Sequence, residues 1–176
     1  MRYHRLCPAG LLAVFAGSPY AAKLGQIDVT ELSAAVAHEE DHVSALELAA
    51  WIRDRKPGLR VIDLRPAADF ETYHVPGAER VAIESLGSAT FQADDTLVLI
   101  SDGGAHAAQA WVFVRAMGHR NVYFLRGGIN EWLDDVMNPH GPSQEAAALS
   151  RYFGGVPRSS DVKRRNTATA VRRRGC

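Results

Sequence analysis

The chain has 176 residues, of which 47% are hydrophobic and 23% charged. This balance supports one globular domain with a sizeable core and additional residues at the ends, and it excludes a chain that is disordered throughout. The formal net charge is zero, but residues 23–157 contain 11 Lys and Arg against 19 Asp and Glu, whereas residues 158–176 contain 7 against 1. The body of the chain is therefore acidic and its C-terminal segment basic.

Residues 1–22 have the pattern of a secretory signal peptide. Arg2 and Arg5 precede an apolar run that extends from Leu6 to Gly17, and small residues follow up to Ala22. The apolar run is shorter than a membrane-spanning helix requires. We therefore expect export to the periplasm or the extracellular space. A buried first helix, or a translation start placed too early, is the alternative, and the protein would then be cytoplasmic.

The chain contains two cysteines, Cys7 and Cys176, and neither lies in its central part. Two cysteines near opposite ends cannot form a disulfide framework, and they cannot supply a four-cysteine zinc site. We expect no metal and no cofactor.

Two capping boxes predict the first helices. Residues 28–31 (Asp-Val-Thr-Glu) and 44–47 (Ser-Ala-Leu-Glu) each place a short polar side chain three residues before a glutamate. The predicted helices cover about 28–40 and 45–55, and we assign 23–41 to an N-terminal helical extension. Each helix has an apolar stripe that we interpret as core packing, formed by Val29, Leu32 and Val36 in the first and by Leu46, Ala49, Ala50 and Ile52 in the second.

Strand and helix patterns alternate through the centre of the chain. Apolar runs at 59–64, 81–83, 97–100 and 122–125 predict strands, and helical patterns at 67–73, 105–117 and 129–136 lie between or after them. This order predicts an α/β fold, in which a central, mostly parallel sheet has helices on both faces. Ligands of such folds bind at the carboxyl ends of the strands.

The C-terminal part of the chain has a different character. Residues 137–157 are rich in proline and glycine and carry one helical patch at 144–152, so we predict an extension that docks on the domain. Residues 158–176 are low in apolar residues and strongly basic, which predicts a disordered tail.

The segment 97–116 has the shape of an anion site. The buried strand 97–100 is broken by Ser101, Asp102, Gly103 and Gly104, and a helix begins at Ala105. Such a turn directs backbone N–H groups and the positive end of the helix dipole toward one place. A protonated His106 adds positive charge, whereas the carboxylate of Asp102 opposes an anion.

Four motifs follow one another at characteristic spacing between about residues 42 and 136. They are Val61-Ile-Asp63-Leu-Arg65, then Phe70-Glu71 with His74-Val75-Pro76-Gly77-Ala78, then the strand–loop–helix at 97–116, then the segment from Gly118 to Trp132 that contains Gly127-Gly128. In this order they resemble the rhodanese-like domain family. The resemblance implies an α/β domain with a central five-stranded sheet.

Three motifs have structural interpretations. Asp63 and Arg65 can pair with each other or brace the neighbouring loop, and a structural ion pair is the usual role in the family that they resemble. His74 precedes a rigid turn and is interpreted as a packed, hydrogen-bonded side chain rather than a catalyst. The pair Gly127-Gly128 is expected to provide positive φ for the turn into the last helix of the domain.

The resemblance also implies a role for the loop that begins at Ser101. In rhodaneses this loop often reads Cys-x-x-Gly-x-Arg, and its cysteine carries sulfur as a persulfide. Aligned with that pattern, the chain has Ser101 for the cysteine, retains Gly104, and has His106 for the arginine. A serine hydroxyl cannot form a persulfide, and no third group is evident to orient His106 as a base for a serine hydrolase. We therefore expect a binding or regulatory module without standard thiosulfate sulfurtransferase activity.

The C-terminal Cys176 suggests two further hypotheses. It follows Arg172, Arg173 and Arg174, whose charges favour a thiolate, and the tail is long enough to reach the Ser101 loop. In the first hypothesis Cys176 is the nucleophile of a sulfurtransferase or persulfide carrier. In the second, the protein is an anion-binding module whose basic tail docks an acidic partner.

Expected partners follow from the same features. They are a small sulfur-containing anion or another protein. Nucleic acid is not expected, because the acidic body offers no broad basic patch. Membrane contact is expected only through the N-terminal segment or the tail.

Overall fold

The structure is a computed structural model that describes residues 28–157. Within them lie five strands: β1 (His42–Val43), β2 (Leu59–Asp63), β3 (Glu79–Arg80), β4 (Thr96–Ile100) and β5 (Val122–Leu125). Their order in the sheet is β1-β5-β4-β2-β3, and every neighbouring pair is parallel. The predicted α/β fold with a five-stranded parallel sheet is confirmed. The predictions for the signal peptide at 1–22, for Cys7 and for the basic tail with Cys176 lie outside the described residues.

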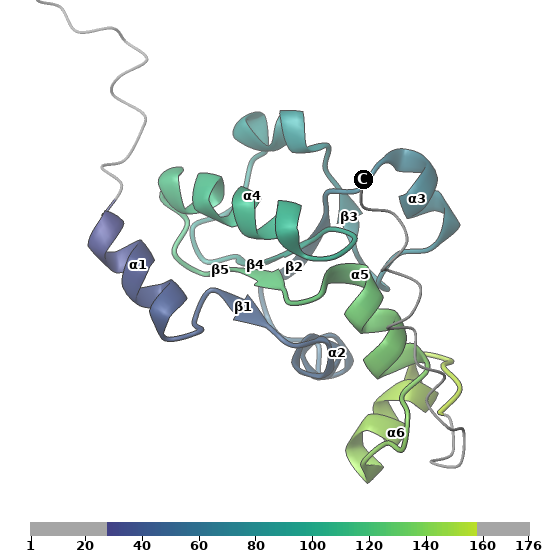
Figure 1. Cartoon of the computed structure of the whole chain (residues 1–176). Coiled ribbons are helices and arrows are strands. Elements are labelled where there is room, and N and C mark those ends of the chain that lie inside the picture. Colours follow the sequence, from purple (N-terminus) through teal and green to yellow (C-terminus); the bar gives the residue numbers. More distant parts are fainter. Residues whose placement is uncertain (1–27, 158–176) are drawn as a thin grey trace, which may run out of the picture.

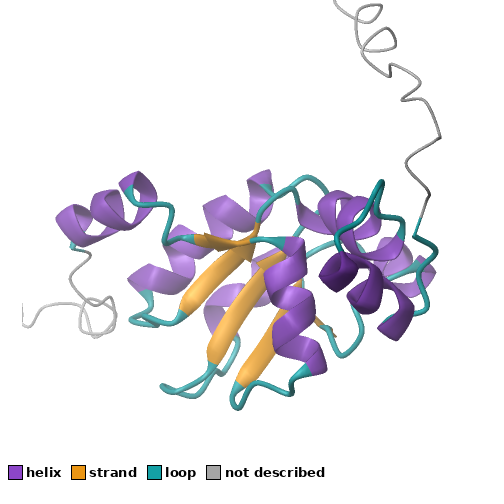
Figure 2. Ribbon diagram, turned by 90° about the horizontal axis from the view of Figure 1, so that it is seen from below, coloured by secondary structure: helices purple, strands orange, loops and turns teal. Residues whose placement is uncertain are grey.

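The helices cover both faces of the sheet, as predicted (Figures 1 and 2). Those described are α1 (Val29–Ala37), α2 (Ala45–Arg53), α3 (Ala67–Thr72), the 3₁₀ helix η2 (Ile83–Ser88), α4 (Ala105–Ala116), α5 (Gly128–Glu131), the π-helix η3 (Trp132–Met137) and α6 (Gln144–Tyr152). No helix in this part of the chain has the length and apolar character needed to cross a membrane.

The core has two halves, because successive residues of a strand point to opposite faces. Val98 and Ile100 of β4 pack with residues of α2, α5, η3 and α6, including the fully buried Trp132. Leu97 and Leu99 pack on the other face against α4, where Trp111 is the largest side chain. The run at 97–100 is thus a strand buried on both faces, as its fully apolar sequence predicts.

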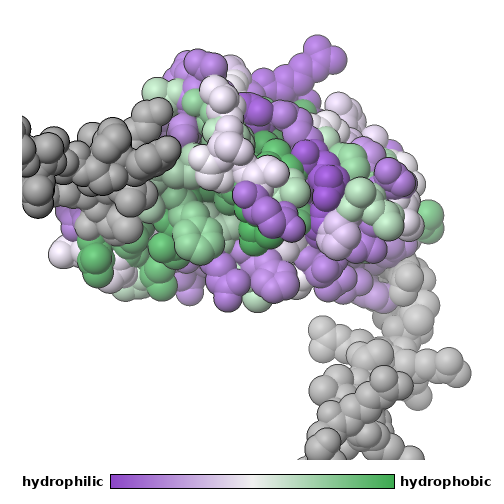
Figure 3. Space-filling model, turned by 90° about the horizontal axis from the view of Figure 1, so that it is seen from above, coloured by the Kyte–Doolittle hydropathy of each residue, from purple (hydrophilic) through white to green (hydrophobic). Residues whose placement is uncertain are grey.

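The outer surface of α4 is partly apolar. Val112 and Phe113 are 41% and 59% exposed, and Figure 3 shows hydrophobic and hydrophilic areas side by side on the face where this helix lies. The buried stripe of α4 consists of Ala107, Ala110, Trp111 and Val114.

The interpretation of the α1 stripe as core packing is wrong. No residue of α1 is buried, and Val29 and Val36 are 71% and 55% exposed. Figure 1 shows α1 beyond the β1 edge of the sheet. Leu32 and Ala35 contact the second half of the core. Only the side of α1 that carries Leu32 and Ala35 contacts the domain. The other apolar residues of the stripe, Val29 and Val36, therefore remain exposed to solvent.

The two predicted caps form, although the capping boxes are incomplete. Asp28 accepts hydrogen bonds from the amides of Thr30 and Glu31, and Ser44 accepts one from Glu47. The carboxylate of Glu31 does not reach back to Asp28; it accepts from two arginines that follow α1 far along the chain. A glutamate at this position can therefore tie the helix to the domain instead of closing its N-terminus.

Two strands and one helix differ from the predictions. The edge strand β3 covers 79–80 instead of 81–83. It pairs with the end of β2, where Glu79 lies beside Ile62. Residues 83–88 form the 3₁₀ helix. The two-residue strand β1 has no periodic signal of its own. The helix predicted at 129–136 begins as α5 and continues as a π-helix.

The segment 137–157 packs on the domain through α6. This helix contacts α2 and η3, and its Leu149 is buried in the first half of the core. The hydroxyl of the fully buried Ser150 lies 3.4 Å from the carbonyl oxygen of Met137 and donates to it.

Candidate functional site

The predicted loop lies at the carboxyl edge of the sheet. β4 ends at Ile100, Ser101 follows directly, and α4 begins at Ala105 after Gly104, whose φ is 88°. The amide of Leu64, which follows β2, donates to the carbonyl of Ile100 at 2.9 Å. The ends of β2 and β4 are thereby joined next to Ser101, at the edge where parallel α/β sheets bind ligands.

The side chain of Ser101 points into the protein. The residue is 4% exposed, and its Oγ accepts a hydrogen bond of 3.2 Å from the amide of Ala107 in the first turn of α4. Most of the remaining loop faces solvent, because Asp102, Gly103 and His106 are exposed, whereas Gly104 is buried. The hydroxyl is therefore held against the helix N-terminus, beneath a polar rim.

Several backbone donors of this loop have no acceptor in the described part of the chain. The amides of Gly103, Gly104, Ala105 and His106 donate to no group within residues 28–157, whereas the next two donate to Ser101 Oγ and to the Gly104 carbonyl. Unpaired N–H groups at the start of a helix of twelve residues carry partial positive charge. This arrangement can receive an anionic group.

The loop rests on the turn between β5 and α5. The carbonyl of Ser101 accepts from the amide of Ile129 at 2.9 Å, and that of Asp102 accepts from Asn130 at 3.3 Å. Gly127 and Gly128 have φ of 64° and 60°, which confirms the predicted positive φ at both positions. The turn between β5 and α5 thus holds the first two residues of the loop in place.

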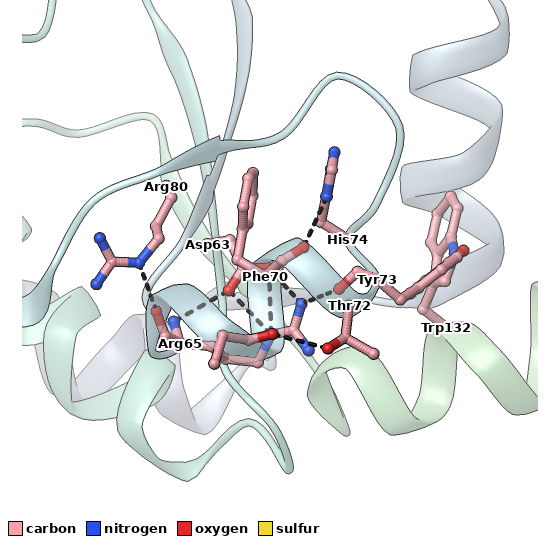
Figure 4. A network of polar contacts seen from close by, with 9 residues as sticks. Asp63, Arg65, Phe70, Thr72, Tyr73, His74, Arg80 and Trp132 are labelled. Atoms are coloured by element: carbon pink, nitrogen blue, oxygen red, sulfur yellow. Dashed lines mark hydrogen bonds and ion pairs between the residues drawn. The ribbon is translucent and has the colours of Figure 1, made fainter.

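Asp63 and Arg65 form a buried ion pair beside the loop (Figure 4). The distance from Arg65 Nη2 to Asp63 Oδ2 is 2.7 Å, and the side chains are 6% and 0% exposed. Arg65 also donates to the carbonyl of Tyr73, and its own carbonyl accepts from Arg80. The predicted structural ion pair is confirmed, and it fixes the chain that leads from β2 to α3.

The charge on Arg65 is strongly favoured. Its hydrogen bonds to Asp63 raise its pKa, and the carboxylates of Asp102 and Asp69 add to this effect against the cost of burial. Asp102 therefore lies in the field of a cation that is already paired. The exposed part of the loop thus carries an acidic group, Asp102. The buried cation beside it, Arg65, is already neutralised by Asp63.

His74 is packed and hydrogen-bonded, as predicted. Its Nδ1 lies 2.9 Å from the carbonyl oxygen of Phe70, and its ring stacks on that of Phe70 with centroids 4.0 Å apart. A neighbouring contact was not predicted: Trp132 Nε1 donates to the hydroxyl of Tyr73 at 2.9 Å (Figure 4). Burial raises the pKa of this tyrosine. The sequence carries no signal for the pair, which is separated by 59 residues.

The site does not form a hydrolytic triad among the described residues. Ser101 Oγ contacts the amide of Ala107, and neither His106 nor Asp102 hydrogen bonds to it within residues 28–157. The same part of the chain has no group of three His, Cys, Asp or Glu side chains that could hold a metal ion. What the geometry offers is a set of backbone donors around a buried hydroxyl.

Fold and site together define a parallel α/β domain with a strand–loop–helix at the carboxyl edge of its sheet. Residues 44–135, just over half of the chain, match the family model of the Rhodanese-like domain. The chain belongs to the rhodanese-like domain family.

Curated relatives are thiosulfate sulfurtransferases. The protein from Gallus gallus is 32% identical over 142 residues, which cover 61% of this chain and 49% of the relative. The protein from Cricetulus griseus is 29% identical over 127 residues, which cover 53% of this chain and 43% of the relative. The chain therefore matches somewhat less than half the length of these relatives.

Among solved structures, the chain is similar to a protein of unknown function, described as a possible tyrosine phosphatase, from Rhodopseudomonas palustris. The TM-score is 0.50, the identity is 19%, and the match covers 67% of this chain and 84% of the other. At this identity the likeness concerns the fold.

Proposed function

We propose that this chain is a rhodanese-like binding or regulatory module that does not transfer sulfur through its loop. The observation that carries the proposal is the position of Ser101, which heads the loop directly after β4 and whose Oγ accepts a hydrogen bond from the amide of Ala107. In the alignment of this loop with the family's Cys-x-x-Gly-x-Arg pattern, Ser101 corresponds to the catalytic cysteine. The domain would then keep the shape of the sulfurtransferase site without its reactive atom.

The sulfurtransferase reaction of the family needs a nucleophilic sulfur atom at this position. A cysteine thiolate attacks the outer sulfur of thiosulfate, a new S–S bond forms, and the S–S bond of thiosulfate breaks to release sulfite. Cyanide then attacks the terminal sulfur of the persulfide, leaves as thiocyanate, and restores the thiolate. Serine cannot take part, because its hydroxyl is ionised only at very high pH and its oxygen does not hold a transferable sulfur atom.

The remaining donors support binding. The amides at 103–106 are unpaired among the described residues and lie at the N-terminus of α4, so they suit a small sulfur-containing anion or an anionic group on a protein partner. Asp102 at the rim weakens such binding. This combination favours a protein that binds its ligand without converting it.

The test restores the thiol. Two chains are compared in a background in which Cys7 and Cys176 are replaced by serine: one keeps Ser101, and the other carries Ser101→Cys. Each is incubated with thiosulfate and then cyanide, thiocyanate is measured, and bound sulfur is located by mass spectrometry. We expect turnover and a loop persulfide only with Ser101→Cys. If this variant takes up no sulfur, the correspondence between Ser101 and the family's cysteine is wrong.

The unaltered chain tests the competing hypothesis that Cys176 carries the sulfur. It is treated in the same way beside Cys176→Ser. Sulfur on Cys176 that is passed to cyanide, and is lost in the variant, would overturn the proposal in favour of a persulfide carrier. No transfer in either chain supports the binding module.

A further inference from the structure

An open groove lies between α1 and the β1 edge of the sheet, away from the Ser101 loop. Its volume is about 530 Å³, and its walls come from α1, β1, α2, α4 and β5 together with Glu39, Glu40 and Arg120. No residue of 101–106 lines it. It includes the beginning of β5 at Val122, whereas the loop lies at the carboxyl ends of the strands.

The groove has more acidic groups than its cations neutralise. Its two arginines, Arg115 and Arg120, both pair with Glu31. His42 contacts the neighbouring Asp41. The other carboxylates of the lining belong to Glu39, Glu40 and Glu47; all three are exposed, and none forms an ion pair within the described residues.

Two aromatic rings line the same groove as these carboxylates. Trp51 of α2 and Tyr123 of β5 line the groove and contact each other edge to face, with centroids 5.9 Å apart. The ring of Trp51 already attracts one cation, because Lys56 Nζ lies 3.4 Å from its centroid. Carboxylates next to aromatic faces suit guanidinium groups, which accept both kinds of contact.

The chain itself carries a segment of this chemistry. Residues 158–176 contain seven Lys and Arg and one acidic residue, against 11 basic and 19 acidic residues in 23–157. Pro157, the last residue that the structure describes, lies just after α6. This helix packs on α2, which supplies Glu47 and Trp51 to the groove. Nineteen residues reach about 60 Å when extended, well beyond the ~14 Å radius of gyration of a domain of this size.

We propose that the basic segment 158–176 docks in this groove of its own chain. Its arginines pair with Glu39, Glu40 and Glu47 and lie against the rings of Trp51 and Tyr123. The interaction is intramolecular, so weak contacts suffice, because the linkage raises the local concentration of the segment to the millimolar range. Since the pairs are solvent-exposed, high salt releases the segment. This inference does not depend on the role of Ser101.

The test uses the full chain with Cys7→Ser and a nitroxide spin label on Cys176, next to the arginines of the tail. Line broadening of backbone amides is measured by NMR against the reduced, diamagnetic label. We expect broadening of Val43, Glu47, Trp51 and Tyr123 at low salt and its loss at 1 M salt, where charges are screened beyond about 3 Å.

Two matched triple variants decide whether the groove is the site. Glu39→Gln with Glu40→Gln and Glu47→Gln should abolish the broadening. Glu71→Gln with Glu84→Gln and Asp94→Asn removes the same charge from exposed positions outside the groove and should preserve it. Equal loss in both variants would mean unspecific attraction to an acidic surface and would overturn the proposal.

The remaining outcomes are also decisive. Broadening centred on residues 101–107 would mean that the tail lies over the Ser101 loop. Absence of broadening would mean that the tail does not bind in the groove. Either result contradicts the proposal. Isotope-labelled chains without the spin label are also mixed with unlabelled chains that carry it. Broadening of the groove in that mixture would assign the occupant to a second copy. The assay measures no sulfur transfer, so its failure is distinct from failure of the proposed function.

Discussion

The carbonyl oxygen of Ser101 lies 2.1 Å from the position that a Cβ atom would take on Gly128, and the carbonyl oxygen of Asp102 lies 2.6 Å from it. Side-chain carbons do not approach carbonyl oxygens so closely. Gly128 also has a φ of 60°, which L-residues rarely adopt. The turn that begins α5 thus determines where the first two residues of the loop lie.

Gly128→Ala should therefore destabilise the protein and displace the loop. We expect a loss of about 3 kcal/mol in the free energy of unfolding, because a steric clash is added to an unfavourable backbone conformation. Urea denaturation measures the loss, and the NMR shifts of the 101–107 amides report the displacement.

The matched control is Gly103→Ala in the same loop. A Cβ at this position meets nothing within 4 Å, and its φ is not in the left-handed region. Its stability should stay close to that of the unaltered chain. Similar losses for the two variants would show that the loop does not rest on Gly128 as described.

Asp63→Asn should lower the free energy of unfolding by about 3–5 kcal/mol, because it leaves the guanidinium of Arg65 buried without its counter-charge. Chemical denaturation measures the effect. Asp54→Asn is the control, since Asp54 pairs with Arg53 at the surface and should have little effect on stability. If the two variants behave alike, the buried pair does not hold the end of β2.

Much of this site could be predicted from local sequence. A charged pair two residues apart at the end of an apolar strand has few arrangements other than pairing, and Asp63 and Arg65 pair as expected. The glycines at 127–128 and the break after Ile100 are local signals of backbone conformation, and they too are found where they were predicted.

What could not be predicted depends on contacts that are distant in sequence. The stripe with Val29 and Val36 has the periodicity of a buried helix, yet burial depends on how much of the domain lies beside α1, and the sheet ends at β1. Strand β3 is placed by its register with β2 rather than by its own side chains, which are a glutamate and an arginine. The groove beside α1 likewise exists only after five elements have come together.

Tyr73→Phe should lower the free energy of unfolding by about 1 kcal/mol, because the indole N–H of the fully buried Trp132 then loses its acceptor. Urea denaturation followed by circular dichroism measures the change. Tyr152→Phe removes a hydroxyl from a residue that is 58% exposed and should have no effect. Equal stabilities of the two variants would contradict a contribution from the Tyr73 hydroxyl.

Glu79→Gln should destabilise the protein near pH 7 and have progressively less effect as the pH falls. Both carboxylate oxygens of Glu79 accept hydrogen bonds from Arg60, at 3.0 and 2.8 Å, and these bonds hold the pKa of Glu79 below its ordinary value of 4.5. Because the folded protein binds the proton less readily than the unfolded chain, this contribution is fully present above pH 4.5 and is lost as the pH falls through the folded pKa.

The measurement for Glu79 is the unfolding midpoint of both chains between about pH 2.5 and pH 7. The two curves should be separate at neutral pH and converge at the acidic end. Glu71→Gln is the control, because Glu71 is exposed and forms no ion pair within the described residues, so its curve should follow that of the unaltered chain. A constant difference between Glu79→Gln and the unaltered chain at every pH would mean that the side chain stabilises the β3 edge by packing, without the charged hydrogen bonds to Arg60.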